Sequence, residues 1–151
     1  MTAEELLARY AAGERDFSGI DLSDEDLSLA ALSGINLSGA ILDQTGWEGS
    51  NLTGADLSNS YLFQASLDGA NLSETNLSGA YIAESALRNT TLDKANLSCA
   101  NLRGTCLSSS FLNDVNLEST LFCDTIMPDG TIRDDGCEYV EEWRRGGFRF
   151  C

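Results

Sequence analysis

Residues 50–79 decide the fold, and in groups of five they read SNLTG-ADLSN-SYLFQ-ASLDG-ANLSE-TNLSG. The third residue of every group is leucine. Outward from this stretch, a large apolar residue recurs every five residues from Phe17 to Phe122, at 22 positions of which 18 are leucine. The residue two places earlier is Ala, Ser or Thr at 17 of the 21 positions between 20 and 120. The chain is therefore an internal repeat with a period of five.

A period of five fits neither an α-helix, which needs apolar residues about every 3.6 positions, nor the alternation of a plain strand. The small and the large residue of each group lie two apart, as on one face of a strand, and polar pairs such as Ser38-Gly39 or Thr53-Gly54 then turn the chain. One such unit cannot bury its leucine alone. The units must therefore stack into a solenoid, with the leucines inside.

Three groups match the motif A-(D/N)-L-x-x closely: 55–59, 70–74 and 95–99. With these residues, and with the repeat over about 15–124, the chain resembles the pentapeptide-repeat family, and its two ends look most like those of bacterial, particularly cyanobacterial, members. The resemblance implies an all-β solenoid, a right-handed quadrilateral β-helix with four units per coil. The repeats would then form about five and a half coils and a rod roughly 26 Å long, at about 4.8 Å per coil.

The length of 151 residues fits a single domain with one core. We expect a helical cap at 1–14, the β-helix at 15–124, and a turn with a second helical cap at 125–151. Each cap would cover an end coil that otherwise exposes leucines and unpaired strand edges.

Local signals predict what the caps contain. Thr2 and Glu5 have the spacing of a capping box, which predicts a helix over 3–12 that Gly13 ends. The sequence Pro128-Asp129-Gly130 predicts a turn. The run from about 135 to 145 has acids early and arginines late, which matches the dipole of a helix.

Two residues depart from the repeat. Trp47 lies at a leucine position, where an indole should overpack the interior at a cost of about 1–3 kcal/mol. The nearby Gly46 and Gly49 suggest a local backbone adjustment, a bulge without function. Glu25 lies at an inward small position, which is costly unless the first coil is open there or a partner such as Arg15 is near.

Composition excludes several functions. The chain carries 24 acidic and nine basic residues, a net charge of −15, and no histidine. This charge opposes binding to nucleic acid or to an anionic membrane surface. Without histidine there is no His-dependent triad, general base or metal ligand. We find no serine with a base partner, and therefore expect no enzyme, no cofactor and no metal site.

The N-terminus lacks the basic start and apolar run of a signal peptide, and no stretch approaches the length of a membrane span, so we expect a cytoplasmic protein. Its five cysteines include no CxxC pair. In that compartment we expect mostly free thiols. The pairing that the sequence allows for is Cys137 with Cys151, within the C-terminal segment.

Folding the units onto four sides stacks residues that are twenty apart. One side carries a polar ladder from Asp16 to Asn116, which we interpret as structural. The next side carries large outward apolar residues, with Tyr61 above Tyr81 and Leu121 further along. This candidate patch for a partner comprises Ile41, Tyr61, Phe63, Tyr81 and Ala83. Contiguous apolar patches mark contact sites, and tyrosine is enriched at hot spots. Equally, these residues could pack on one another or against a terminal segment.

Three functions follow as hypotheses. The first is a non-enzymatic interaction module or scaffold, a monomer or weak homodimer, with an unknown protein partner on this patch. The second comes from the resemblance, because some family members are acidic DNA mimics that bind type II topoisomerases such as DNA gyrase. The net charge favours it, but residues 1–50 hold ten of the acids, so the charge does not follow the shaft. The third is a redox-responsive structural protein, because Cys99, Cys106 and Cys123 lie at outward positions.

Overall fold

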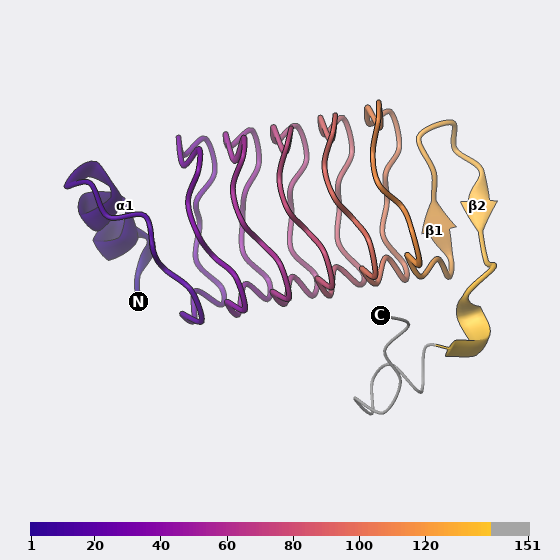
Figure 1. Cartoon of the computed structure of the whole chain (residues 1–151), viewed down its shortest axis with the longest axis horizontal. Helices are drawn as coiled ribbons and strands as arrows, with labels where there is room; N and C mark the ends of the chain where they lie inside the picture. Colours follow the sequence, from indigo (N-terminus) through magenta and orange to yellow (C-terminus); the bar gives the residue numbers. More distant parts are fainter. Residues whose placement is uncertain (140–151) are drawn as a thin grey trace.

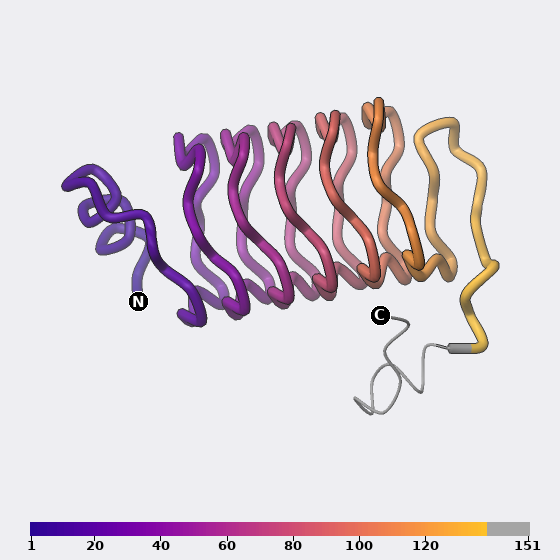
Figure 2. Tube along the Cα trace, in the orientation of Figure 1, coloured from indigo at the N-terminus to yellow at the C-terminus, as the bar shows by residue number. Residues whose placement is uncertain are grey.

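The computed structural model describes residues 1–139, and Figure 1 shows them as a row of stacked coils between a helix and a hairpin. Helix α1 (Ala3–Ala11) lies at one end of the row. Strands β1 (Thr125–Ile126) and β2 (Ile132–Arg133) lie at the other end, followed by the 3₁₀-helix η1 (Cys137–Tyr139). The tube in Figure 2 follows the same path and shows how each coil lies beside the next.

Each coil contains twenty residues. Isolated parallel bridges join residues twenty apart, from Asp16 with Asn36 to Cys106 with Ile126. We number the four sides of a coil from its start: the first side contains 16–20, the second 21–25, the third 26–30 and the fourth 31–35. The same sides recur in every coil. Backbone N–H groups donate both forward and backward, as Leu57 does to the Asn76 oxygen (2.7 Å) and Asp56 to the Ile35 oxygen (2.9 Å). The interior coils thereby pair their backbone groups without long strands.

The large apolar residues of the repeat form the core. From Phe17 to Leu107, every member of the series is at most 1% exposed. Most hydroxyls at the small inward positions donate to backbone carbonyls, whereas the buried Ser50 Oγ has no hydrogen-bond partner. Thr75 Oγ1, for example, donates to the Leu52 oxygen of the preceding coil at 2.9 Å. Alanine, serine and threonine therefore suit these positions because they are small enough for close backbones and most of their hydroxyls find acceptors.

The corners between sides explain the polar residues of each group. The last residue of each group has a positive φ, such as 67° at Gly54 and 56° at Asn59. Glycine, asparagine and aspartate accept this left-handed conformation most readily. The residue before the leucine stabilises the turn with its side chain. Asn51 Oδ1, for example, accepts the N–H of Thr53 at 3.1 Å. Local chemistry thus sets a corner every five residues.

The expected adjustment at Trp47 is wrong. Trp47 is fully buried, and its N–H still donates to the Ser66 oxygen at 2.7 Å, as a leucine of the repeat would. The bridges of Gly46 to both neighbouring coils are intact. The indole N–H donates to Thr45 Oγ1 at 2.6 Å, which leaves no unpaired polar atom on the ring. The coil therefore takes the larger ring without a bulge.

Helix α1 seals the first coil as its capping signals predict. Thr2 is the N-cap, and its side chain and that of Glu5 form the reciprocal capping box. Leu6 is fully buried against the core. Glu25 finds a partner other than Arg15, because its Oε2 accepts the N–H of Ala3 at 2.7 Å. A carboxylate of the first coil therefore satisfies a backbone donor at the positive end of the helix.

At the other end, β1 and β2 pair antiparallel with Ile126 opposite Ile132. The expected turn lies between them, where the Gly130 N–H donates to the Met127 oxygen at 2.9 Å. The chain then returns over the second side, and the Gly136 N–H donates to the Phe122 oxygen at 2.8 Å. Within the predicted helix of about 135–145, the described residues form the 3₁₀-helix η1. The remainder of that prediction concerns residues outside the described range.

Candidate functional site

Outward residues of the second side form a continuous row across the middle coils. Parallel bridges join Ile41 to Tyr61 and Tyr61 to Tyr81. The rings of Tyr61 and Tyr81 lie 6.5 Å apart between centroids and are tilted by 51°, whereas Phe63 stacks on Tyr81 at 6.3 Å and 26°. These distances are those of packed aromatic pairs. We call Ile41, Tyr61, Phe63 and Tyr81 the aromatic face.

The aromatic face is partly open to solvent. Tyr61 is 48% exposed and Ile41 39%, while Phe63 and Tyr81 are half-buried. Tyr81 makes further interactions beyond the ring contacts given above. The accessible centre of the face is therefore Ile41, Tyr61 and the open part of Phe63.

Two residues assigned to this outward surface are in fact buried. Ala83 has no exposed surface, and Leu121 is 3% exposed. Phe63 and Arg103 flank Ala83 in the neighbouring coils, and the Arg103 side chain reaches back to Glu84, so the methyl group is enclosed by longer side chains. Leu121 is covered because the chain returns over it: a Cβ added to Gly136 would lie 3.2 Å from Leu121 Cγ. Ala83 is therefore not available to a partner.

Carboxylates lie on the same side of the coils as the aromatic face. Asp21 and Asp24 lie one coil before Ile41, Asp43 follows Ile41 by two residues, and Glu84 follows Tyr81 by three. Asp43 Oδ1 accepts the N–H of Phe63 at 3.0 Å, which ties this carboxylate to the face. The hydroxyl and N–H of Ser23 donate to the Asp21 side chain and hold its pKa below the ordinary value. The edge of the face is thus negatively charged at neutral pH.

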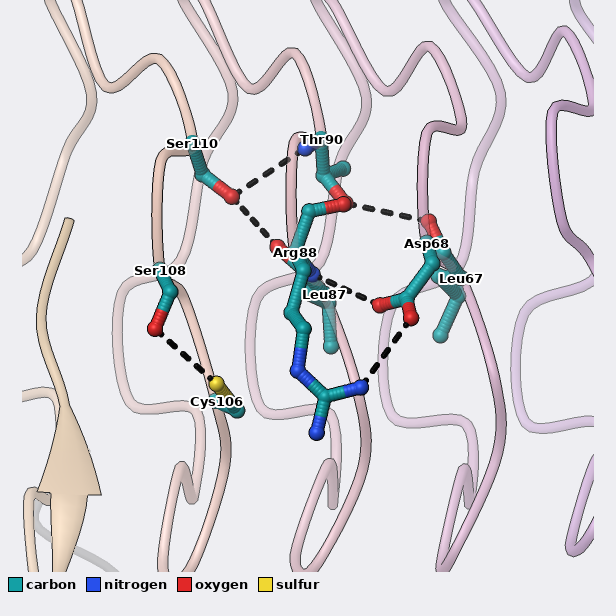
Figure 3. Close-up of polar contacts among 8 residues, drawn as sticks. All are labelled: Leu67, Asp68, Leu87, Arg88, Thr90, Cys106, Ser108 and Ser110. Atoms are coloured by element: carbon teal, nitrogen blue, oxygen red, sulfur yellow. Dashed lines mark hydrogen bonds and ion pairs between the residues drawn. The ribbon is translucent and has the colours of Figure 1, made fainter.

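A second polar cluster lies on the third side of the rod (Figure 3). The guanidinium of Arg88 pairs with Asp68 at 3.2 Å, and the Asp68 carboxylate also accepts the Arg88 N–H at 2.8 Å. Cys106 Sγ lies 3.2 Å from the hydroxyl oxygen of Ser108. Burial opposes ionisation of the Cys106 thiol, but hydrogen bonds from Ser108 and Arg88 together outweigh it, so the pKa of Cys106 lies below its ordinary value.

The cysteines are mostly not free thiols. Cys123 and Cys137 form a disulfide with their Cα atoms 4.6 Å apart, and Cys99 is also disulfide-bonded. The proposed Cys137–Cys151 pairing is therefore wrong, because the return of the chain over Phe122 brings Cys137 to Cys123 instead. Cys151 itself lies outside the described residues. Among residues 1–139 the free thiol is that of Cys106.

The polar ladder of the first side has the structural role expected of it. Bridges connect its members from Asp16 to Asn116. Asn36 Nδ2 donates to Asp16 Oδ1 at 3.2 Å, and Asn36 Oδ1 accepts the Ser38 N–H at 3.0 Å. These side chains are engaged in the coil itself, which leaves little for a ligand.

Neither a metal centre nor a membrane helix is found in the described part of the chain. Within residues 1–139, no three side chains of the metal-binding kinds gather closely enough to hold an ion. In the same range, no helix has the length and apolar character needed to cross a bilayer.

A family model for pentapeptide repeats matches the chain with eight copies, over residues 30–69, 48–79 and 70–108. The chain belongs to the pentapeptide-repeat family. Members of this family fold as right-handed quadrilateral β-helices, which agrees with the four-sided coils described above. No curated protein sequence matches the chain.

Solved pentapeptide-repeat structures resemble it as well. Rfr23 from the cyanobacterium Cyanothece 51142 is 25% identical over 87% of this chain and all of its own, with a TM-score of 0.43. The protein alr5209 from Nostoc PCC 7120 is 29% identical over 79% of this chain and 74% of its own, with a TM-score of 0.36. HetL from the same strain, which is involved in heterocyst differentiation regulation, is 24% identical over 88% of this chain and all of its own, with a TM-score of 0.30.

Within this pentapeptide-repeat protein, the period of twenty brings together the residues of the aromatic face that sequence reasoning selected. Sequence reasoning missed the carboxylates at the edge of the aromatic face and the cluster of Asp68, Arg88 and Ser108 on the third side. The stacking rule could have found the third-side cluster, since Asp68, Arg88 and Ser108 are spaced by twenty residues. The Cys123–Cys137 bond has no such signal.

Proposed function

We propose that this pentapeptide-repeat protein is a non-enzymatic interaction module whose protein partner docks on the aromatic face. The observation that supports the proposal is the exposure of Tyr61 and Ile41 in adjacent coils of a rod whose other outward rows are mostly polar. Burying these side chains against a partner would remove apolar area from water, at about 25 cal/mol per Å². The close ring packing holds Tyr61 and Phe63 in place before binding, which lowers the entropy cost of association.

The interior of the coils supports a docking role rather than catalysis. Its inward groups are apolar side chains and small residues, and most of their hydroxyls are bonded to backbone carbonyls. A rod of this kind offers its outer sides as a rigid platform, as solenoids generally do.

The experiment compares capture of proteins from the source lysate by three baits. These are the natural chain, a Tyr61→Ala/Phe63→Ala double variant, and a Phe111→Ala variant. Phe111 is 57% exposed on the fourth side and is therefore a matched control for loss of one exposed ring. We expect the double variant to lose a captured protein that the other two baits retain. Equal capture by all three baits would remove the aromatic face from the function.

An acidic DNA mimic that binds a type II topoisomerase is the second candidate. The net charge of −15 favours it, and Ser18, Ser23 and Ser28 keep the pKa values of Asp16, Asp21 and Asp26 low, so the first coil stays charged. The acids concentrate near one end of the rod rather than along it. A gyrase supercoiling assay with a large excess of the protein tests this candidate, and undiminished supercoiling would reject it.

A further inference from the structure

Charge around the aromatic face is poorly balanced by the described chain. Among residues 1–139, the basic side chain on the second side is that of Arg103. Its guanidinium forms an ion pair with the Glu84 carboxylate at 3.0 Å. The N-terminal amino group lies at the edge of this side, where it donates to the backbone oxygen of Asp21 at 3.2 Å. No cation among the described residues forms an ion pair with Asp24 or Asp43.

We propose that the aromatic face binds a protein segment in which an arginine or lysine lies beside an aromatic or aliphatic side chain. This inference rests on the proposed docking function and adds the chemistry of the partner. The apolar side chain of the segment packs on Tyr61 and Ile41, and its cation reaches Asp24 and Asp43.

The aromatic face favours the apolar side chain of the segment, and the carboxylates at its edge favour the cation. A purely apolar partner would bury carboxylates beside it without compensation, which opposes binding. A purely basic partner would gain only weak ion pairs at an exposed edge, because water and salt screen them. A segment that carries both groups satisfies the face and its edge together. Arginine is especially suitable because its flat guanidinium also stacks on an exposed tyrosine ring.

The carboxylates can be neutralised without disturbing the coil. In Asp43→Asn, the side-chain oxygen still accepts the Phe63 N–H. Asp24 has a φ of 63°, a conformation that asparagine tolerates as well as aspartate. The Asp24→Asn/Asp43→Asn variant therefore removes two charges from the edge and leaves the aromatic face in place. Asp114→Asn, at a corner of the fourth side with a φ of 57°, is the matched control for loss of a corner acid.

The test measures binding of four synthetic peptides to the full chain by fluorescence anisotropy. The first alternates arginine with phenylalanine; the second has glutamine in place of arginine, the third alanine in place of phenylalanine, and the fourth glutamate in place of arginine. We expect the first peptide to bind at least about tenfold more tightly than the others, and less tightly as salt is raised. The Asp24→Asn/Asp43→Asn variant should bind the first peptide as weakly as the natural chain binds the second, whereas Asp114→Asn should match the natural chain.

Several results would overturn the inference. If the glutamine peptide binds as tightly as the arginine peptide, the partner is apolar. If the double asparagine variant binds the arginine peptide unchanged, Asp24 and Asp43 do not bind its cation. In either case the docking function alone survives. If Tyr61→Ala/Phe63→Ala binds every peptide like the natural chain, the proposed function fails as well. Sedimentation that shows self-association lost in that variant would identify a second copy as the occupant. If replacing the arginines of residues 140–151 by glutamine tightens binding of the first peptide tenfold, the chain itself is the occupant.

Discussion

The two ends of the rod are sealed by different means. At the N-terminal end, one helix covers the first coil, and Phe17, Leu22 and Leu27 are all 1% exposed. At the C-terminal end of the described chain, a hairpin and a returning segment cover the second and third sides. There Phe122 is buried at 2% exposure, whereas Leu112 and Leu117 on the fourth and first sides are half-buried.

The two ends differ in whether neighbouring or distant residues determine the structure that covers them. Helix α1 is specified by neighbouring residues, because its capping box lies within four positions. The C-terminal cover depends on contacts between distant residues: Arg133 lies over the Phe122 ring at 3.6 Å, and Cys137 is bonded to Cys123. A local signal can be recognised in a sequence, and a contact across a loop generally cannot.

The largest expected difference concerns leucines at the two ends. Leu6→Ala removes a fully buried side chain from the N-terminal seal and should lower the free energy of unfolding by about 2–5 kcal/mol. Leu112→Ala, at the half-buried C-terminal position, should cost about half as much. Urea unfolding followed by circular dichroism measures both variants. Equal losses would mean that the two ends are sealed equally well.

A smaller effect is expected where the chain returns over Phe122. A Cβ in Gly136→Ala would lie 2.9 Å from the Phe122 backbone oxygen, so the segment must move away, at a cost of about 1–3 kcal/mol. The loosened segment should also expose the Cys123–Cys137 disulfide to faster reduction by dithiothreitol, followed by thiol labelling and mass spectrometry.

Gly130→Ala serves as the control for this change. Its φ is 83°, and no atom lies within 4 Å of an added Cβ, so the cost is backbone strain of about 1 kcal/mol. The reduction rate of the disulfide should stay at that of the natural chain. If Gly136→Ala behaves like Gly130→Ala, the close approach to Phe122 does not hold the segment.

The bond between Glu25 and α1 tests the N-terminal seal more finely. Glu25→Ala leaves the Ala3 N–H without its acceptor and should lower the free energy of unfolding by about 1 kcal/mol. Glu25→Gln keeps an acceptor and should lose only the charge contribution, about half of that value. Thermal unfolding compares the two variants, and an alanine variant as stable as the glutamine variant would show that the acceptor is dispensable.

The smallest effect is a response to pH that we expect in the turns of the first coil. Asp16, Asp21 and Asp26 accept the N–H groups of serines two residues later, and the pKa of each carboxyl is lowered by that serine. Because these pKa values are lower in the folded chain, the stabilisation is complete above the ordinary carboxyl pKa. It is lost as the pH falls through the lowered values.

Several corresponding turns of later coils use asparagine, as at Asn36 and Asn76, which does not titrate. Hydrogen-exchange protection factors at Ser18 and Ser23 should therefore fall on acidification, while those at Ser38 and Ser78 stay constant. Asp21→Asn should make Ser23 behave like Ser38. A uniform loss of protection along the rod would contradict this account.

The coils could be predicted from the sequence because the residues that determine each unit lie within that unit. Leucine, a small residue and a corner residue are all within five positions, and stacking follows from the need to bury each leucine. Trp47 shows the limit of such reasoning. Its predicted strain depended on the size of a leucine slot, but the fit of the ring depends on the Thr45 hydroxyl and on how the neighbouring coils pack.

The candidate site was predictable to a similar degree. Residues twenty apart could be placed together, which brought Ile41, Tyr61 and Tyr81 into one row. The burial of Ala83 could not be predicted, because it depends on which way the long side chain of Arg103 points. Charge pairing on the surface is decided by such rotamers, and a sequence pattern does not fix them.

Because each coil contains twenty residues, the position of a residue in the sequence determines the side of the rod on which it lies. Removing one five-residue unit would turn everything after it by a quarter of a circle, while leaving the leucine interior unchanged. A deletion between Ile41 and Tyr61 would therefore send the two parts of the aromatic face in different directions, on a scaffold that still folds. Loss of a whole coil would shorten the rod and keep the direction of every side. Inserting or deleting one five-residue unit in this molecule thus rotates the coils that follow it. The surface residues are then arranged differently, although no side chain has been substituted.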